Sequence, residues 1–148
     1  MLKLLTLHNM NIVIIGTGYV GLVTGVGLAS LGNNVDFIDL DENKIKDLSS
    51  KKITFYEPGL EEYFNDDETF KRMSFSSDYA SIEWDNIDIV FVCVQTPNNI
   101  ETNSVDTKFL ESAIKEINNV NNNELVITVK STIPPYEIEK AVSYTHLT

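Results

Sequence analysis

Three glycines near the start of the chain have the spacing that phosphate-binding turns require. They are Gly16, Gly18 and Gly21, in the order G-x-G-x-x-G. An apolar run, residues 12–15, leads into them, and a segment with helical patterning, residues 20–31, leads out. A turn between a strand and a helix presents unpaired backbone N–H groups and about +0.5 of partial charge to phosphate oxygens. The pattern in this setting predicts a dinucleotide-binding turn.

Each glycine has its own expected role in that turn. Gly16 sits where the chain leaves the strand, and a side chain held at positive φ there would cost roughly 1–2 kcal/mol. Gly18 has no Cβ, so a pyrophosphate can approach its backbone closely. Gly21 lets the helix lie close to the sheet, and Gly25, one turn later, extends that flat face.

A second apolar run, residues 35–38, ends in Asp39, which lies 18 residues after Gly21. An acid at this position accepts hydrogen bonds from the adenosine ribose hydroxyls and repels a 2′-phosphate, which favours NAD over NADP. Asp39 at a solvated strand end or as a helix cap is the structural alternative. Asp41, which directly precedes residues 42–45, is the better cap, so we assign Asp39 the cofactor role.

The composition narrows the class of protein. The 148 residues suffice for about one domain with a real core, and 43% of them are hydrophobic. The net charge of −11 disfavours nucleic acid as a partner, because phosphate backbones are repelled. The single cysteine excludes an internal disulfide and a thiolate zinc site, and we expect no metal. No apolar stretch approaches the roughly 20 residues of a membrane span, so the cytoplasm is the expected compartment.

Both ends of the chain differ from its middle. Met10 would make a normal start directly before the first strand, so residues 1–9 are interpreted as an upstream extension or a mistaken start. Residues 142–148 abruptly stop following the preceding helical pattern and resemble translated adaptor sequence. We therefore place the domain at residues 10–141.

Strand and helix patterns alternate along this domain. Further strands are expected at residues 73–76, 87–94 and 125–129. Helices are expected at residues 41–48, near residues 60–64 and at residues 78–84. A further helix is expected after an Asp106 cap, and its apolar stripe consists of Phe109, Leu110, Ala113, Ile114 and Ile117. Residues 95–104 are expected to form a polar loop. Alternating strands and helices predict an α/β fold, a Rossmann-type doubly wound parallel sheet with right-handed crossovers.

Four segments are expected to meet at one edge of this sheet. Residues 16–21, Asp39, residues 95–98 and residues 130–132 all follow predicted strands. Ligands of such sheets bind beyond the carboxyl ends of the strands, at the point where the strand order reverses. Their convergence predicts a site in that crevice.

Five motifs along the chain match one family in order and spacing. They are residues 16–25, 38–41, 56–60, 94–97 and 130–134, and from about residue 10 to 141 the chain resembles the amino-terminal domain of the UDP-glucose 6-dehydrogenase family. Residues 19–25 and the Tyr-Glu-Pro-Gly-Leu turn at 56–60 favour the UDP-glucose branch. Relatives that act on UDP-N-acetylhexosamines or GDP-mannose remain alternatives.

The resemblance implies a two-step, NAD-dependent oxidation of the C6 alcohol of a nucleotide sugar to a carboxylate. It implies that the pyrophosphate is held by the glycine turn, made of Gly16, Thr17, Gly18, Tyr19, Val20 and Gly21, and that the adenosine ribose meets Asp39 and Lys44. The path to the nicotinamide would be lined by the loop Val94, Gln95, Thr96, Pro97 and Asn98. The catalytic edge would be formed by Ser131 and Thr132. Thr132 matches a family threonine that helps to hold water near the reacting carbon. Lys44 as a solvated residue of an exposed helix face is an open alternative.

The family's nucleophile is a cysteine in a glycine-rich motif downstream of the residues present here. Cys93 is no substitute, because a small cysteine inside an apolar strand is usually inert packing. We therefore expect a sheet truncated before its sixth strand and a chain that is inactive alone. The full-length protein is expected to act on UDP-glucose or a related nucleotide sugar and to form a homodimer or a larger oligomer.

Two other classes of function stay open at this point. One is a stand-alone dinucleotide-binding or sensing module without a catalytic domain. The other is a 6-phosphogluconate-type or hydroxyacyl dehydrogenase fold, against which the motifs at residues 56–59 and 130–132 argue.

Overall fold

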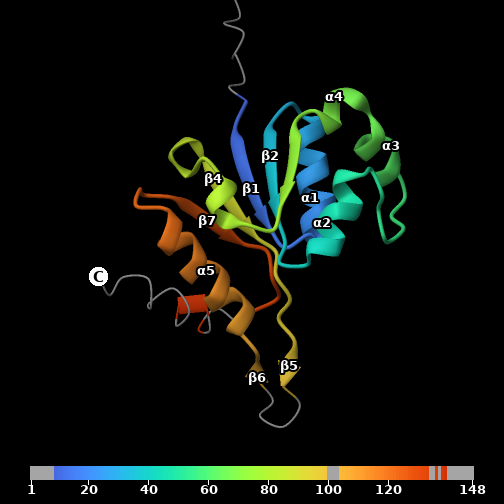
Figure 1. Ribbon diagram of the computed structural model, residues 1–148. Helices are drawn as coiled ribbons and strands as arrows, with labels where there is room; N and C mark the ends of the chain where they lie inside the picture. Colours follow the sequence, from blue (N-terminus) through green and yellow to red (C-terminus); the bar gives the residue numbers. More distant parts are fainter. Residues whose placement is uncertain (1–8, 100–103, 134–135, 137, 140–148) are drawn as a thin grey trace, which may run out of the picture.

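The central element of the computed structural model is a five-stranded parallel sheet (Figure 1). The structure describes residues 9–99, 104–133, 136 and 138–139. The strand order is β3-β2-β1-β4-β7, so the chain builds outward from β1 in both directions. The strands are β1 (Asn11–Ile15), β2 (Asn34–Ile38), β3 (Met73–Ser76), β4 (Ile89–Val92) and β7 (Val126–Val129). The predicted Rossmann-type doubly wound sheet is confirmed, while its truncation before a sixth strand stays a prediction.

Helices cover both faces of the sheet, as Figure 1 shows. The helices are α1 (Tyr19–Ser30), α2 (Glu42–Ser49), α3 (Leu60–Asn65), α4 (Asp67–Phe70) and α5 (Lys108–Val120). Buried residues of α1, α2 and α3 belong to the core on one face, and those of α5 belong to the core on the other. Because all four strand pairings of this sheet are parallel, each connection returns the chain to the same end of the sheet.

Side chains of β1 alternate between these two cores. Ile12 and Ile14 pack toward α1, whereas Val13 and Ile15 pack toward α5, and all are nearly inaccessible to solvent. A strand that is buried on both faces needs apolar residues throughout, which explains the continuous run at residues 12–15. In the core on the α1 side, the Phe37 and Phe75 rings stack with their centroids 5.0 Å apart.

The segment after β4 differs from the predicted loop. β4 ends at Val92, earlier than the predicted 87–94, and a short antiparallel hairpin follows, β5 (Asn98–Asn99) and β6 (Ser104–Val105). Figure 1 shows this hairpin extending beyond the carboxyl ends of the sheet strands. Asparagine and serine are poor strand formers, so local pattern gave no signal for this pairing.

Two predicted helices also differ in detail. The expected helix at residues 78–84 is a pair of 3₁₀ turns, Tyr79–Ser81 and Trp84–Asn86. The cap of α5 lies one residue later than predicted, at Thr107; Asp106 instead accepts a 3.0 Å hydrogen bond from the Lys108 N–H with its Oδ1. Asp41 is the N-cap of α2, as predicted, and accepts from the N–H groups of Asn43 and Lys44. Residues 1–8 and 142–148 lie outside the described residues, so the interpretation of both ends stays a prediction.

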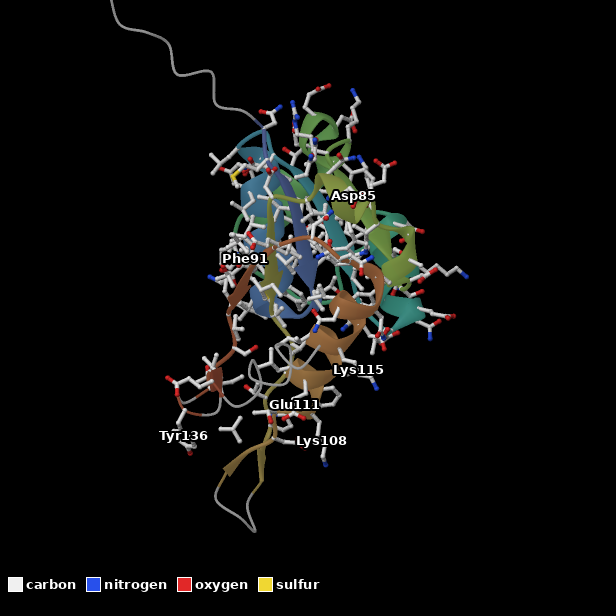
Figure 2. The ribbon with its side chains drawn as sticks, turned by 90° about the vertical axis from the view of Figure 1, so that its left-hand side faces the viewer. Asp85, Phe91, Lys108, Glu111, Lys115 and Tyr136 are labelled. Carbon is white, nitrogen blue, oxygen red and sulfur yellow. The ribbon has the colours of Figure 1, made fainter. Side chains whose placement is uncertain are left out.

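Helix α5 separates its charged and apolar side chains. Figure 2 shows Lys108, Glu111 and Lys115 projecting from the helix, and all three are exposed. On its inner side Leu110 is 0% exposed, whereas the neighbouring Phe109, predicted to share the buried stripe, is 50% exposed.

Because Leu110 is buried and Phe109 is half-exposed, alanine substitutions at the two positions should change the free energy of unfolding by different amounts. Leu110→Ala should lower the free energy of unfolding by about 2–5 kcal/mol, because it leaves a cavity in the core. Phe109→Ala should lower it by much less. Urea unfolding followed through the fluorescence of Trp84, the single tryptophan, measures both. Equal losses in the two variants would contradict the described packing of α5.

Candidate dinucleotide site

The glycine turn connects β1 to α1 with very little space around it. Gly16 has φ +93°, a conformation that L side chains rarely adopt, and a Cβ there would lie 2.8 Å from the Cys93 carbonyl oxygen. A Cβ on Gly21 would lie only 1.8 Å from the Gly16 carbonyl oxygen. The close approach predicted for Gly21 and Gly25 is observed: a Gly21 Cβ would also lie 3.2 Å from the Cys93 Cβ, just after β4, and a Gly25 Cβ would lie 2.3 Å from the Phe37 ring.

Gly18 differs from these glycines because space in front of it is open. A Cβ on Gly18 would meet no heavy atom within 4 Å. Gly18 is the N-cap of α1 and provides no side-chain cap, and the first turn of the helix carries no acidic residue. Among the described residues, no side chain therefore competes for the N–H groups of that turn. This open approach suits a phosphate bridge of a dinucleotide.

Asp39 lies directly beside this turn, at the carboxyl end of β2. Its Oδ2 accepts hydrogen bonds from the Thr17 N–H at 2.8 Å, the Thr17 hydroxyl at 2.7 Å and Lys44 Nζ at 3.0 Å. Its Oδ1 accepts from the Asp41 N–H at 3.0 Å. The glycine turn and the predicted ribose-binding acid are thus joined into one structure.

These contacts keep the Asp39 carboxyl ionised. Burial alone would raise its pKa, but hydrogen bonds from Asp41, from Thr17 and from Lys44 outweigh burial and hold the pKa below its ordinary value of 3.8. The side chain of Asp39 is 13% exposed and that of Lys44 is 30% exposed, so this ion pair is partly shielded from solvent. The pair therefore carries a charged acceptor at neutral pH next to the turn.

A cavity of about 260 Å³ opens beside Asp39. Six of the predicted cofactor residues line it: Gly16, Gly18, Asp39, Lys44, Val94 and Gln95. Five of them directly follow three strands that are neighbours in the sheet, β1, β2 and β4, and Lys44 lies in the first turn of α2. The predicted convergence of these three segments is observed.

The far wall of the cavity comes from residues that sequence reasoning missed. They are Tyr79 from the first 3₁₀ turn, and Phe109, Ser112, Ala113 and Glu116 from α5. Burial, together with the charges of Glu116 and Asp39, raises the pKa of Tyr79 to about 12, so its phenol stays protonated. The apolar periodicity of α5 was a usable signal, but it could not show that Phe109 faces a cavity and not the core.

The remaining predicted residues lie outside the cavity wall. Tyr19 and Val20 are exposed on the first turn of α1. Ser131 donates from its hydroxyl to the Val94 carbonyl at 2.7 Å, and Thr96 donates to the Thr132 carbonyl at 3.4 Å. These bonds tie the segment after β7 to the segment after β4.

The other members of the loop set have mainly backbone roles in the structure. The Pro97 carbonyl accepts from the Asp106 N–H at 2.8 Å, and Asn98 pairs with Val105 in the hairpin. The roles predicted for Thr132, Thr96, Pro97 and Asn98 toward a cofactor or substrate stay predictions.

Cys93 was predicted to have a packing role alone, but it contacts both the core and the cavity. It packs against the core on the α1 side, as expected, but it also lines the cavity. Burial raises the pKa of its thiol to about 11, and the charge of Lys130 offsets only part of this effect. At neutral pH the group is a protonated thiol and a poor nucleophile.

Alkylation of Cys93 should therefore be slow at pH 7.5 and should quicken about tenfold per pH unit up to its pKa, because only the thiolate reacts. Iodoacetamide labelling followed by mass spectrometry gives the rate, without interference, since the chain has one cysteine. A rate that levels off near pH 8 would contradict the described burial.

The described residues contain neither a metal-binding cluster nor a membrane-spanning helix. No group of three or more His, Cys, Asp or Glu is arranged there to hold a metal ion. In the same part of the chain, no helix combines the length and apolar character that a bilayer span needs.

A parallel sheet of this order, with a glycine turn, an ionised acid and a cavity at its switch point, defines a dinucleotide-binding protein of the Rossmann type. Residues 10–146 match the NAD-binding domain of the UDP-glucose/GDP-mannose dehydrogenase family. The chain belongs to this family, and its cofactor is NAD, as the sequence predicts.

Individual relatives agree with this assignment. UDP-glucose 6-dehydrogenase of Rickettsia prowazekii is 36% identical over 135 residues, which are 91% of this chain and 31% of the relative. A UDP-glucose dehydrogenase structure from Pyrobaculum islandicum has a TM-score of 0.80 at 29% identity, covering 93% of this chain and 33% of that one. A GDP-mannose dehydrogenase structure from Pseudomonas aeruginosa has a TM-score of 0.81 at 29% identity, covering 90% and 31%. The chain thus spans about a third of the length of these relatives.

Proposed function

We propose that this chain is the NAD-binding part of a UDP-glucose 6-dehydrogenase. The full-length protein would oxidise the C6 alcohol of UDP-glucose to the carboxylate of UDP-glucuronate and reduce two NAD. The observation that carries the proposal is the joined glycine turn and Asp39 carboxylate at the mouth of one cavity. NAD, when bound, supplies the hydride acceptor, and the residues of this chain bind and orient it.

Each part of the cofactor would be bound by a different group of residues. The open N–H groups at Gly18 and the start of α1 would hold the pyrophosphate. Asp39 would accept from the adenosine ribose, with Lys44 paired to it. The apolar wall from Leu40, Phe109 and Ala113 suits a flat base such as adenine. Ser131 and Thr132, which follow β7, would lie toward the reacting end of the cofactor.

The short chain alone should not oxidise the sugar. The resemblance implies a cysteine nucleophile, and the single cysteine present is Cys93, whose pKa of about 11 leaves it protonated. The purified chain, given NAD and UDP-glucose, should form no NADH above background. Steady NADH formation by the pure chain would overturn this part of the proposal.

Cofactor binding is tested by calorimetric titration of the chain with NAD and with NADP. The account expects binding of NAD and much weaker binding of NADP, because the Asp39 carboxylate repels a 2′-phosphate. Equal affinity for the two would contradict the role given to Asp39. No binding of either would contradict the assignment of the cavity.

A second candidate is oxidation of another nucleotide sugar. The GDP-mannose dehydrogenase structure matches this fold as well as the UDP-glucose dehydrogenase structure does, with TM-scores of 0.81 and 0.80. NADH formation by the full-length protein with UDP-glucose, UDP-N-acetylmannosamine or GDP-mannose separates the candidates. The proposal expects turnover of UDP-glucose with two NADH for each sugar.

A further inference from the structure

We propose that Thr17 is a positioning residue, which holds the Asp39 carboxylate so that a single oxygen, Oδ1, is presented to the adenosine ribose. This inference rests on the proposed function for its ligand. It gives Thr17 a role different from the phosphate contact that the resemblance implies for the glycine turn. The inference concerns a side chain that stands between two glycines of the motif.

The Thr17 hydroxyl is buried and donates a hydrogen bond to the Asp39 carboxylate. Thr17 is 2% exposed, and its hydroxyl and its N–H both donate to Oδ2 of Asp39, at 2.7 and 2.8 Å. A buried hydroxyl committed to a carboxylate is not available to an incoming phosphate. Thr17 is also absent from the cavity wall, whereas its neighbours Gly16 and Gly18 line it.

The two oxygens of Asp39 consequently differ in what they can still accept. Oδ2 accepts three hydrogen bonds, two from Thr17 and one from Lys44, which exceeds the two lone-pair directions of one oxygen. Oδ1 accepts one, from the Asp41 N–H. The oxygen with remaining capacity is Oδ1, so this is the atom that is left to accept a hydrogen bond from a ribose hydroxyl.

Thr17 fixes this orientation better than Lys44 can. The Lys44 side chain is 30% exposed and reaches Asp39 through four flexible methylenes. The Thr17 side chain is short and buried, and its backbone N–H already holds the same oxygen. Loss of the hydroxyl removes the shortest of the three hydrogen bonds to Oδ2 and should loosen the hold on the carboxylate, while the bonds from the Thr17 N–H and Lys44 remain.

The test compares Thr17→Val, which removes the hydroxyl but keeps the shape, with Thr17→Ser, which keeps the hydroxyl but removes a buried methyl. Three quantities are measured: the affinity for NAD by calorimetry, the pKa of the Asp39 carboxyl by ¹³C NMR, and the free energy of unfolding in urea. The other ionisable side chains of the cavity wall that lie near Asp39, including Lys44, Tyr79 and Glu116, are the same in both variants, so a change in the Asp39 pKa reports the substitution at Thr17.

We expect Thr17→Val to weaken NAD binding about tenfold and to raise the pKa of Asp39, since one hydrogen bond to a charged group is lost. Thr17→Ser should bind NAD within about threefold of the unaltered chain. A merely structural role predicts instead that both variants lose affinity in step with their stability, which would overturn the proposal. An unchanged Asp39 pKa in Thr17→Val would overturn it too. If the unaltered chain binds no NAD, the proposed function fails, and the carboxyl titration alone then decides the role of Thr17.

Discussion

Replacing Asp39 by alanine should weaken NAD binding by about 10- to 100-fold, because hydrogen bonds between the ribose and a charged acceptor are lost. The affinity of NADP should fall less or should rise. Without the carboxylate a 2′-phosphate is no longer repelled, and the Lys44 ammonium, which lies 3.0 Å from Oδ2, is released from its partner. The ratio of the two dissociation constants, measured by calorimetry, should move by more than tenfold toward NADP.

In the unaltered chain, the Asp39 carboxyl also predicts how stability and NAD affinity depend on pH. The hydrogen bonds to Asp39 lower its folded pKa, so their stabilising effect is present above the unfolded pKa of about 3.9 and is lost as the pH falls through the folded value. Between pH 5 and 8 the carboxylate stays charged. On this account the NAD affinity of the unaltered chain does not titrate through Asp39 in that range.

A matched control separates local chemistry from net charge. Asp47→Ala removes the same charge from α2, where the partly exposed Asp47 pairs with Lys52 at 3.2 Å. This control should leave the NAD to NADP ratio unchanged. An equal change of the ratio in both variants would mean that overall charge, and not the position of Asp39, sets the cofactor preference.

Replacing Gly21 by alanine should damage the fold as well as the site. The added Cβ would lie 1.8 Å from the Gly16 carbonyl oxygen, so α1 must move away from the turn. We expect a loss of at least about 3 kcal/mol in the free energy of unfolding. For a domain of this size such a loss lowers the melting temperature by roughly 10 °C. NAD binding should fall below detection, because the turn no longer closes.

Gly27 in the same helix provides the control. A Cβ at Gly27 would meet nothing within 4 Å, and alanine is the better helix former by about 0.8–1.0 kcal/mol. Gly27→Ala should therefore raise the melting temperature or leave it unchanged, with NAD binding intact. Circular dichroism melts of the two variants give the comparison. A tolerated Gly21→Ala would contradict the close approach of helix and turn.

Local sequence was sufficient for most of the framework. The strands around residues 12–15 and 35–38 are mostly buried apolar runs, and the Asp41 cap follows from a single local hydrogen-bonding motif. The segment after β4 was less predictable. Its hairpin forms from asparagine, serine and valine through pairing that no local propensity indicates.

The site was predictable where it follows strand ends, and less so where it depends on contacts across the chain. Gly16, Gly18 and Asp39 line the cavity, as expected from their positions directly after strands, and their roles toward a cofactor stay predictions. Phe109 and Glu116 were missed because helical periodicity predicts which side of a helix is apolar, but not which of its residues line a cavity and which lie in the core. The hydrogen bond from Thr17 to Asp39 joins residues 22 positions apart, and nothing in the identity of threonine signals it.

The most direct test of this account is a crystal structure of the chain with NAD. The account predicts the pyrophosphate over the open space at Gly18, and an adenosine ribose hydroxyl within hydrogen-bonding distance of Oδ1 of Asp39. A dinucleotide bound elsewhere, or a ribose turned away from Asp39, would contradict it.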